Sequence, residues 1–184
     1  MQQPIRNLNS GNIAGLLADF TAELSDIGKS ISGLTGVPLL IALKRHQVGH
    51  GPYPSVTLFE AANRIMSDLV ILHGVLGLLN CKALPFCEYT VEFGNEDKNG
   101  FDIRATAGSS TLAGEAFNVA PSFFQAKKAS ALRKLRKGAS QATYKVVMFN
   151  SDAVSGAYAS RTEPGILQVA VDIAASTVTI KPLP

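Results

Sequence analysis

Two carboxylates in the middle of the chain have the chemistry and spacing of a candidate site for a divalent metal ion. Asp102 follows a polar turn over residues 94–100, and Glu115 lies within the next predicted strand. The strand face that carries Glu115 is otherwise apolar, since it is formed by Ala113, Phe117 and Val119. Burying an unpaired carboxylate there is costly, so a cation, a hydrogen-bond network or a metal ion must compensate for its charge.

The turn between the two strands decides whether these carboxylates meet. A turn centred on Gly108 and Ser109 places Asp102 opposite Glu115, with both side chains on one face of the sheet. A turn shifted by one residue would weaken this pairing. Neighbouring carboxylates repel each other, which favours a divalent cation such as Mg²⁺ or Mn²⁺ between their oxygens.

The elements around this pair indicate an α/β (α+β) fold with a mixed central sheet. Alternating apolar and polar residues predict a three-strand antiparallel meander, followed by a helix opened by Ser122 and stopped by Gly138. The strand–helix–strand order after the meander implies that its third strand pairs in parallel with the fourth. The predicted strands cover residues 87–93, 101–105, 111–119, 144–149, 166–173 and 177–180, and the helix covers 123–137.

Helices precede the meander. Apolar residues at spacings of three and four predict a helix of about five turns over residues 13–31 and a short second helix over 38–46. Thr57 and Glu60 form a capping box that begins a helix ending near Leu79. We expect one domain over residues 1–184, with a helical part (1–56), a core (57–150) and C-terminal strands (151–184). The predicted apolar face of the capped helix consists of Phe59, Ala62, Met66, Leu69, Val70, His73 and Leu76.

The segment from Leu58 to Phe149 resembles the core of the PD-(D/E)XK, or restriction endonuclease-like, nuclease superfamily. The resemblance lies in the order of a helix carrying Glu60, a meander carrying Asp102 and Glu115, a helix and a further strand. It implies that Asp102 and Glu115 bind Mg²⁺ (or Mn²⁺), with Glu60 as an accessory ligand. The metal would polarise the scissile phosphate and lower the pKa of the attacking water. DNA is the implied substrate, in a restriction or repair role, and a homodimer is a further expectation.

One residue departs from the superfamily motif. The position two after Glu115 holds Phe117 instead of lysine, and a phenylalanine can neither orient water nor stabilise a phosphate. The resemblance includes branches in which the following helix supplies this group. We expect Lys128 to be the substitute, with Gln125 as the second candidate.

The same helix is rich in cations that could hold phosphates by a salt-dependent attraction independent of base sequence. The alternative is a solvated face whose positive charges complement the C-terminal end of the helix dipole. The six candidates for binding nucleic acid are Lys127, Lys128, Arg133, Lys134, Arg136 and Lys137.

Structural explanations compete with each catalytic assignment. Glu60 could act only as a capping residue, Asp102 could be a surface residue, and Glu115 could form a salt bridge with Lys128 or Arg104. Three functions therefore stay open. The first is Mg²⁺-dependent hydrolysis of DNA, and the second is a catalytically inactive nuclease-like module that binds nucleic acid or a protein partner. The third is a structural or subunit role in which the apolar N-terminal helix pairs two chains.

Composition places the chain among globular proteins. Of its 184 residues 46% are apolar and 17% are charged, which allows a sizeable core. The net charge of +3 permits, but does not demand, a nucleic-acid partner. The most apolar run, residues 69–79, is too short to span a bilayer. With two cysteines expected as free thiols and no signal peptide expected, we predict a cytoplasmic protein that does not bind a membrane.

Overall fold

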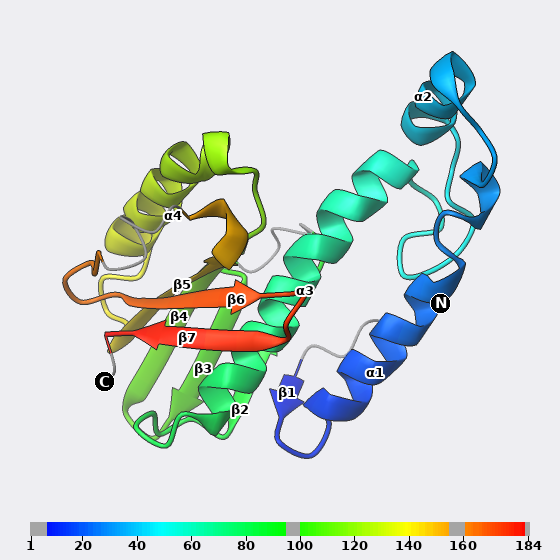
Figure 1. Cartoon of the computed structure of the whole chain (residues 1–184). Helices are drawn as coiled ribbons and strands as arrows, with labels where there is room; N and C mark the ends of the chain where they lie inside the picture. Colours follow the sequence, from blue (N-terminus) through cyan, green and yellow to red (C-terminus); the bar gives the residue numbers. More distant parts are fainter. Residues whose placement is uncertain (1–6, 95–99, 155–160, 183–184) are drawn as a thin grey trace.

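The computed structural model describes residues 7–94, 100–154 and 161–182, so residues 95–99 of the predicted turn lie outside the described part. Seven strands form one sheet in which the order along the chain is also the order in space (Figure 1). The strands are β1 (Asn7–Asn9), β2 (Glu88–Val91), β3 (Ile103–Ala107), β4 (Ser110–Phe117), β5 (Tyr144–Asn150), β6 (Leu167–Asp172) and β7 (Thr177–Lys181).

The sheet is mixed, as predicted. Strands β1 to β4 pair antiparallel, β4, β5 and β6 pair in parallel, and β7 returns antiparallel at the far edge. The expected meander (β2–β4) and the expected parallel pairing of its third strand with β5 are both confirmed. The predicted register of β3 and β4 is also confirmed, since Ala107 pairs with Ser110 and Ile103 with Gly114. Gly108 forms the turn with a φ of 58°.

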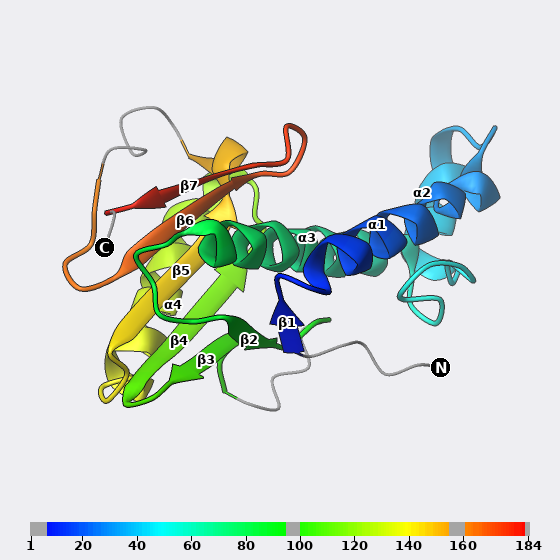
Figure 2. The ribbon, with the colours of Figure 1, turned by 90° about the horizontal axis from the view of Figure 1, so that it is seen from below.

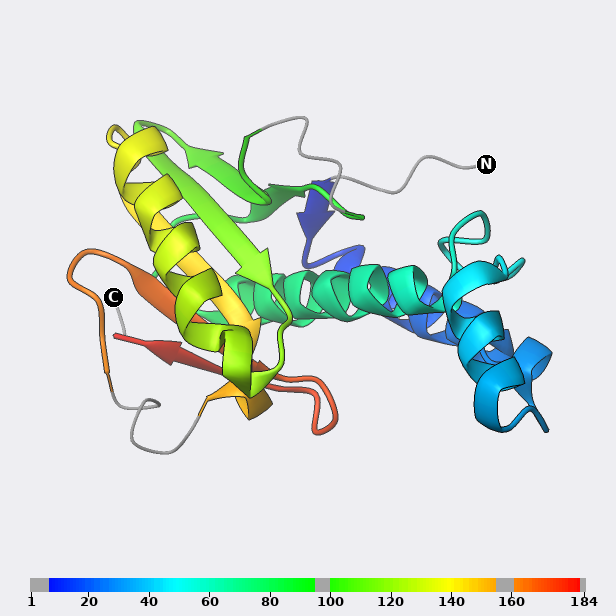
Figure 3. The same cartoon turned by 90° about the horizontal axis from the view of Figure 1, so that it is seen from above.

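Two helices cover opposite faces of the sheet. Helix α3 (Leu58–Asn80) lies in front of the sheet when it is seen from below (Figure 2), and α4 (Phe124–Gly138) lies in front when it is seen from above (Figure 3). Alternate residues of the central strands therefore contribute to two cores. Leu72 and Val75 of α3 pack with Tyr89 in the larger core, and Leu135 of α4 packs with Val147 in the smaller one.

The N-terminal part forms a helical arm. Helix α1 (Ile13–Glu23) lies beside α3, and α2 (Gly36–Arg45) lies near the end of α3 that is remote from the sheet (Figures 1 and 3). The prediction of one long helix over residues 13–31 is wrong. Short 3₁₀ turns replace its second half, because the backbone turns at Gly28 with a φ of 92°. The second predicted helix is confirmed as α2.

The ends and faces of the helices differ in detail from the sequence expectation. The Thr57 hydroxyl caps α3 by accepting the Glu60 N–H at 3.3 Å, as predicted. Phe59 and Met66 are exposed, however, while Ala61 and Ile65 are buried. The segment around Val48 and Tyr53 packs on this part of α3 and selects the buried face. The expected Ser122 cap is absent from α4, whose first residue is preceded by a 3₁₀ turn over Pro121–Phe123.

Helix α3 is also long and apolar enough to cross a membrane, judged by length and composition alone. More than half of its most apolar stretch is buried inside the protein, where it forms the centre of the larger core. Burial of this kind is what a core helix requires, so the apolar character of α3 follows from its place against the sheet.

The crossing of α3 and β7 gives a test of this packing. A Cβ atom at Gly77 would lie 2.6 Å from Cγ1 of Val178, so Gly77→Ala must displace a stiff side chain. We expect a loss of about 1–3 kcal/mol in the free energy of unfolding, measured in urea. The control is Gly15→Ala on α1, where a Cβ atom meets nothing within 4 Å. The free energy of unfolding of this control should rise by about 0.5–1 kcal/mol, because alanine lowers the backbone entropy of the unfolded chain. Equal changes in the two variants would contradict the close crossing of α3 and β7.

Candidate functional site

The structure brings Asp102 and Glu115 together at the open end of the β3–β4 hairpin. Glu115 projects from β4 towards α4, and its side chain is 11% exposed. Asp102 immediately precedes β3, and the register of the two strands, continued by one residue, places it opposite Glu115. Its Oδ2 atom accepts the Ala116 N–H at 2.7 Å, which fixes the carboxylate against β4.

Burial and mutual repulsion make these carboxylates reluctant to ionise together. Burial, with added repulsion from Asp102, raises the pKa of Glu115 to about 7, against the opposing attraction of Lys134. Burial also raises the pKa of Asp102, while the Ala116 N–H, Lys134 and Lys127 act in the opposite direction. A cation bound by oxygens of both carboxylates would stabilise their ionised forms.

Lys134 of α4 supplies a positive charge at Glu115. Its Nζ atom lies 2.8 Å from Glu115 Oε1 and 5.7 Å from the centre of the Phe101 ring. Its side chain is 40% exposed, so the ammonium group has contact with solvent. Phe117, at the motif position of the missing lysine, instead packs its ring against Phe124 and Phe149.

Lys128 and Gln125 have other surroundings than expected. Lys128 Nζ donates to Gln168 Oε1 at 2.9 Å and lies 3.4 Å from Glu163 Oε1, on the β6 side of α4. Gln125 is exposed. Lys134 comes six positions after Lys128, which turns their side chains to different sides of a helix with 3.6 residues per turn. The expected salt bridge of Glu115 is therefore made with Lys134, a residue for which we did not predict this role.

Glu60 is placed apart from the acidic pair. Its carboxylate forms an exposed ion pair with Arg64 one turn along α3. The capping interpretation of Glu60 is confirmed for its backbone N–H, which Thr57 accepts. The structure does not bring its carboxylate to Asp102 and Glu115.

Asp68 is a buried carboxylate that the sequence analysis missed. Its side chain accepts hydrogen bonds from the Tyr53 hydroxyl and, at 3.0 Å, from the Gly94 N–H. Burial raises the pKa of Asp68 to about 6, and Asp102 adds a smaller repulsion. The signal was present, because Asp68 continues the helical spacing of the buried residues Ala61 and Ile65. Asp68 thereby attaches α3 to the segment that follows β2.

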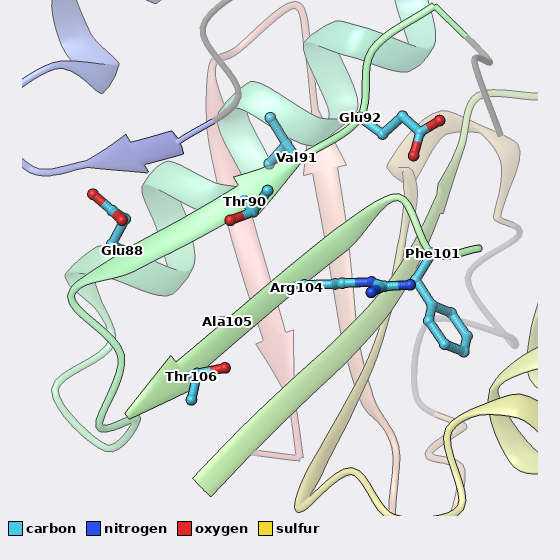
Figure 4. A pocket seen from close by; sticks show the side chains of 8 residues that line it. All are labelled: Glu88, Thr90, Val91, Glu92, Phe101, Arg104, Ala105 and Thr106. Atoms are coloured by element: carbon cyan, nitrogen blue, oxygen red, sulfur yellow. The ribbon is translucent and has the colours of Figure 1, made fainter. Parts of the chain in front are cut away.

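A groove of about 380 Å³ runs over β2 and β3 beside the acidic pair. Glu92, Phe101 and Arg104 line the end nearest Asp102, and Figure 4 shows Arg104 extended towards the Phe101 ring. Glu92 is buried, and its N–H donates to the Asp102 carbonyl at 2.9 Å. Asp102 follows Phe101 in the chain but is not itself among the residues that line the groove.

The cations of α4 divide into two groups. Lys128, Lys134 and Arg136 form ion pairs with Glu163 or Glu115 within the chain. The other three, Lys127, Arg133 and Lys137, are exposed. Lys134 and Arg136 are also exposed, so burial removes only Lys128 from the predicted basic surface.

The residues present can hold a divalent metal through two carboxylates. No group of three or more His, Cys, Asp or Glu side chains in metal-binding position occurs among residues 7–94, 100–154 and 161–182. Mg²⁺ accommodates this arrangement, since it commonly keeps several waters and takes one or two carboxylates together with substrate phosphates.

No protein family, curated protein or solved structure matches the chain at a significant level.

The raised pKa of Glu115 gives a pH-dependent prediction. A folded-state value of about 7 lies above the ordinary value of 4.5, so the folded protein loses stability as pH rises between these values. Glu115→Gln cannot ionise and avoids this loss. We expect the stability of Glu115→Gln relative to wild type to rise by about 1–2 kcal/mol between pH 5 and pH 8, after allowance for partial solvent access.

Urea unfolding at the two pH values measures this change. Glu88→Gln, at an exposed position of β2, controls for the loss of one carboxylate and should alter stability by less than about 0.5 kcal/mol. A Glu115→Gln protein that is strongly destabilised at both pH values would show that the Lys134 ion pair outweighs the burial of the charge.

Proposed function

We propose that this protein is a Mg²⁺- or Mn²⁺-dependent endodeoxyribonuclease with a restriction endonuclease-like core. The observation that carries the proposal is the meeting of Asp102 and Glu115 on adjacent strands, with Lys134 of α4 at 2.8 Å from Glu115. The succession of α3, β2, β3, β4, α4 and β5 also follows the element order on which the resemblance to the PD-(D/E)XK superfamily rests.

In this proposal Asp102 and Glu115 would hold the metal. Two carboxylates would suffice for Mg²⁺, which commonly keeps several waters and binds substrate phosphates. A bound divalent ion supplies polarisation of the scissile phosphate and a lowered pKa for the attacking water. Binding requires both carboxylates to be ionised, so Glu115, with its pKa of about 7, gives up a proton in neutral solution.

Lys134 takes the role of the lysine that is absent at Phe117. Its ammonium group, which contacts both Glu115 and solvent, would lie within reach of a phosphate bound beside the acidic pair. There it stabilises the negative charge that develops as the phosphodiester bond breaks. The Phe101 ring, whose centre is 5.7 Å from Nζ, offers this ammonium group an additional weak cation–π contact beside the acidic pair.

DNA would approach along the groove over β2 and β3. The exposed residues Lys127, Arg133 and Lys137 of α4 can contribute phosphate contacts that weaken as salt concentration rises. Such contacts carry no information on base sequence. We therefore propose binding of DNA through its backbone as the first step of the reaction.

One observation favours the second function, a catalytically inactive module that binds nucleic acid or a protein. The ion pair with Lys134 already gives the Glu115 carboxylate a positively charged partner without a metal ion. A module that uses this pair only to dock α4 on the sheet would keep its fold and its basic surface but would bind no divalent cation.

Thermal unfolding in EDTA, Mg²⁺ and Mn²⁺ separates the two functions. A metal that binds only the folded state raises the midpoint by mass action. We expect wild type to be stabilised by Mn²⁺ and Mg²⁺, and we expect Asp102→Asn and Glu115→Gln to fold but lose this stabilisation. Glu88→Gln should retain it. No midpoint shift of wild type in millimolar metal would support the inactive module.

Cleavage of single- and double-stranded DNA tests Lys134. We expect Lys134→Met to lower the rate of phosphodiester hydrolysis by about 10²–10³, the usual effect of removing a group that stabilises transition-state charge. Stabilisation by Mn²⁺ should remain, because the carboxylates are intact. The control is Lys82→Met, which removes an exposed lysine from the segment between α3 and β2. Equal rates for Lys134→Met and Lys82→Met would contradict the assigned role.

A further inference from the structure

A second groove lies on the face of the sheet that α3 covers, where this helix passes β7 (Figure 1). It has a volume of about 390 Å³. Leu76 of α3 and Val178 and Ile180 of β7 give it apolar walls. No Asp, Glu, Lys or Arg side chain lines it within the described part of the chain.

His73 is the buried polar residue of this groove. It belongs to the apolar face that the sequence predicts for α3, and it is only 6% exposed. Among the described residues, its imidazole has no hydrogen-bond or ion-pair partner. The ring nitrogens keep some accessible surface, since the fully buried, unpartnered side-chain atoms of the described chain are Tyr89 Oη and Glu115 Oε1. Buried polar groups nearly always have a partner, so this imidazole can still bond to a molecule in the groove.

The charge state of His73 narrows the choice of that molecule. Burial lowers the pKa of His73 below its ordinary value of 6.5, so the imidazole is neutral at pH 7. A neutral imidazole donates with one ring nitrogen and accepts with the other, which suits a hydroxyl or an amide. A charged ligand would lose its hydration without meeting an opposite charge in the described lining.

The shape of the groove indicates an elongated ligand. His73, Leu76 and Asn80 are three and four positions apart, so they lie on one side of α3. Cys81 lines the groove eight positions after His73, which is roughly 12 Å along a helix that rises 1.5 Å per residue. A molecule that fills this length contacts both α3 and β7.

We propose that this groove binds a small, uncharged organic molecule with an elongated apolar body, whose hydroxyl or amide group bonds to His73. Sites for small molecules combine mostly apolar walls with a few polar groups at fixed positions. The position of His73 is fixed because its neighbours on α3, Leu72 and Val75, are buried in the larger core. Asn80, which is exposed, adds a second polar group to the lining.

This site is independent of the proposed nuclease chemistry. Asp102 and Glu115 are not part of its lining, and Glu115 projects towards α4 on the other face of the sheet. The groove can therefore bind its ligand whether or not the acidic pair holds a metal.

Titration of the full chain, followed by nuclear magnetic resonance of its histidines, tests the site with four probes. Hexanol and hexanamide each carry an uncharged hydrogen-bonding group on an apolar chain, hexanoate carries a charge on the same chain, and acetamide lacks the chain. We expect saturable binding of hexanol, hexanamide or both, with a shift of the His73 imidazole signals. The exposed His46 and His50 should keep their signals. Hexanoate and acetamide should each bind at least about tenfold more weakly.

Three variants locate the binding. His73→Phe keeps a ring in the core but removes the hydrogen bond, and it should weaken binding at least about tenfold. Asn80→Trp fills the groove from an exposed position of α3 and should weaken binding as much. Asn63→Trp, at another exposed position of the same helix, is the matched control and should have no effect. If His73→Phe fails to fold, Asn80→Trp alone decides.

Three results would overturn the proposal. The first is the absence of saturable binding of both hexanol and hexanamide at about 10 mM, tenfold above a millimolar dissociation constant. The second is equal affinity in Asn80→Trp and wild type, or binding that leaves the His73 signals unchanged. The third is binding of hexanoate as tight as that of the uncharged compounds, which would contradict the class of ligand.

Discussion

Glu115 lies on β4 beneath α4, where Lys134 approaches its carboxylate from the helix and Asp102 approaches from the neighbouring strand. Burial disfavours the charge of Glu115, Asp102 disfavours it further, and Lys134 only partly offsets both effects. Strands β3 and β4, helix α4 and the segment after β2 all contribute to this cluster. A cation that both carboxylates share would relieve the strain of keeping two like charges close together.

The remaining architecture holds the strands and α4 in place around that cluster. Helix α3 supports the other face of the sheet and, through Asp68, holds the Gly94 backbone near the end of β2. Helix α4 presents Lys134 towards Glu115 on one side and Lys128 towards Gln168 on the other. One helix thus contributes a lysine to each of two separate polar clusters, one around Glu115 and one around Gln168.

Regular patterns in the sequence were enough to predict the mixed sheet. They also placed Asp102 opposite Glu115, because the Gly108 turn fixes the β3–β4 register. Side-chain partners were harder to predict. Choosing Lys134 over Lys128 depends on how α4 rotates about its axis, which the packing of Leu132 and Leu135 against β5 determines. The helical spacing of Ala61 and Ile65 places Asp68 on the buried face of α3, but its partners Tyr53 and Gly94 are distant in sequence and could not be predicted.

Titration of Mn²⁺ into the protein, with free ion measured by electron paramagnetic resonance, tests most directly whether the acidic pair is a metal site. The account predicts saturable binding to wild type that rises with pH near the pKa of Glu115, about 7, and that is lost in Asp102→Asn and Glu115→Gln. Binding that is absent from wild type, or equal in all three proteins, would contradict it.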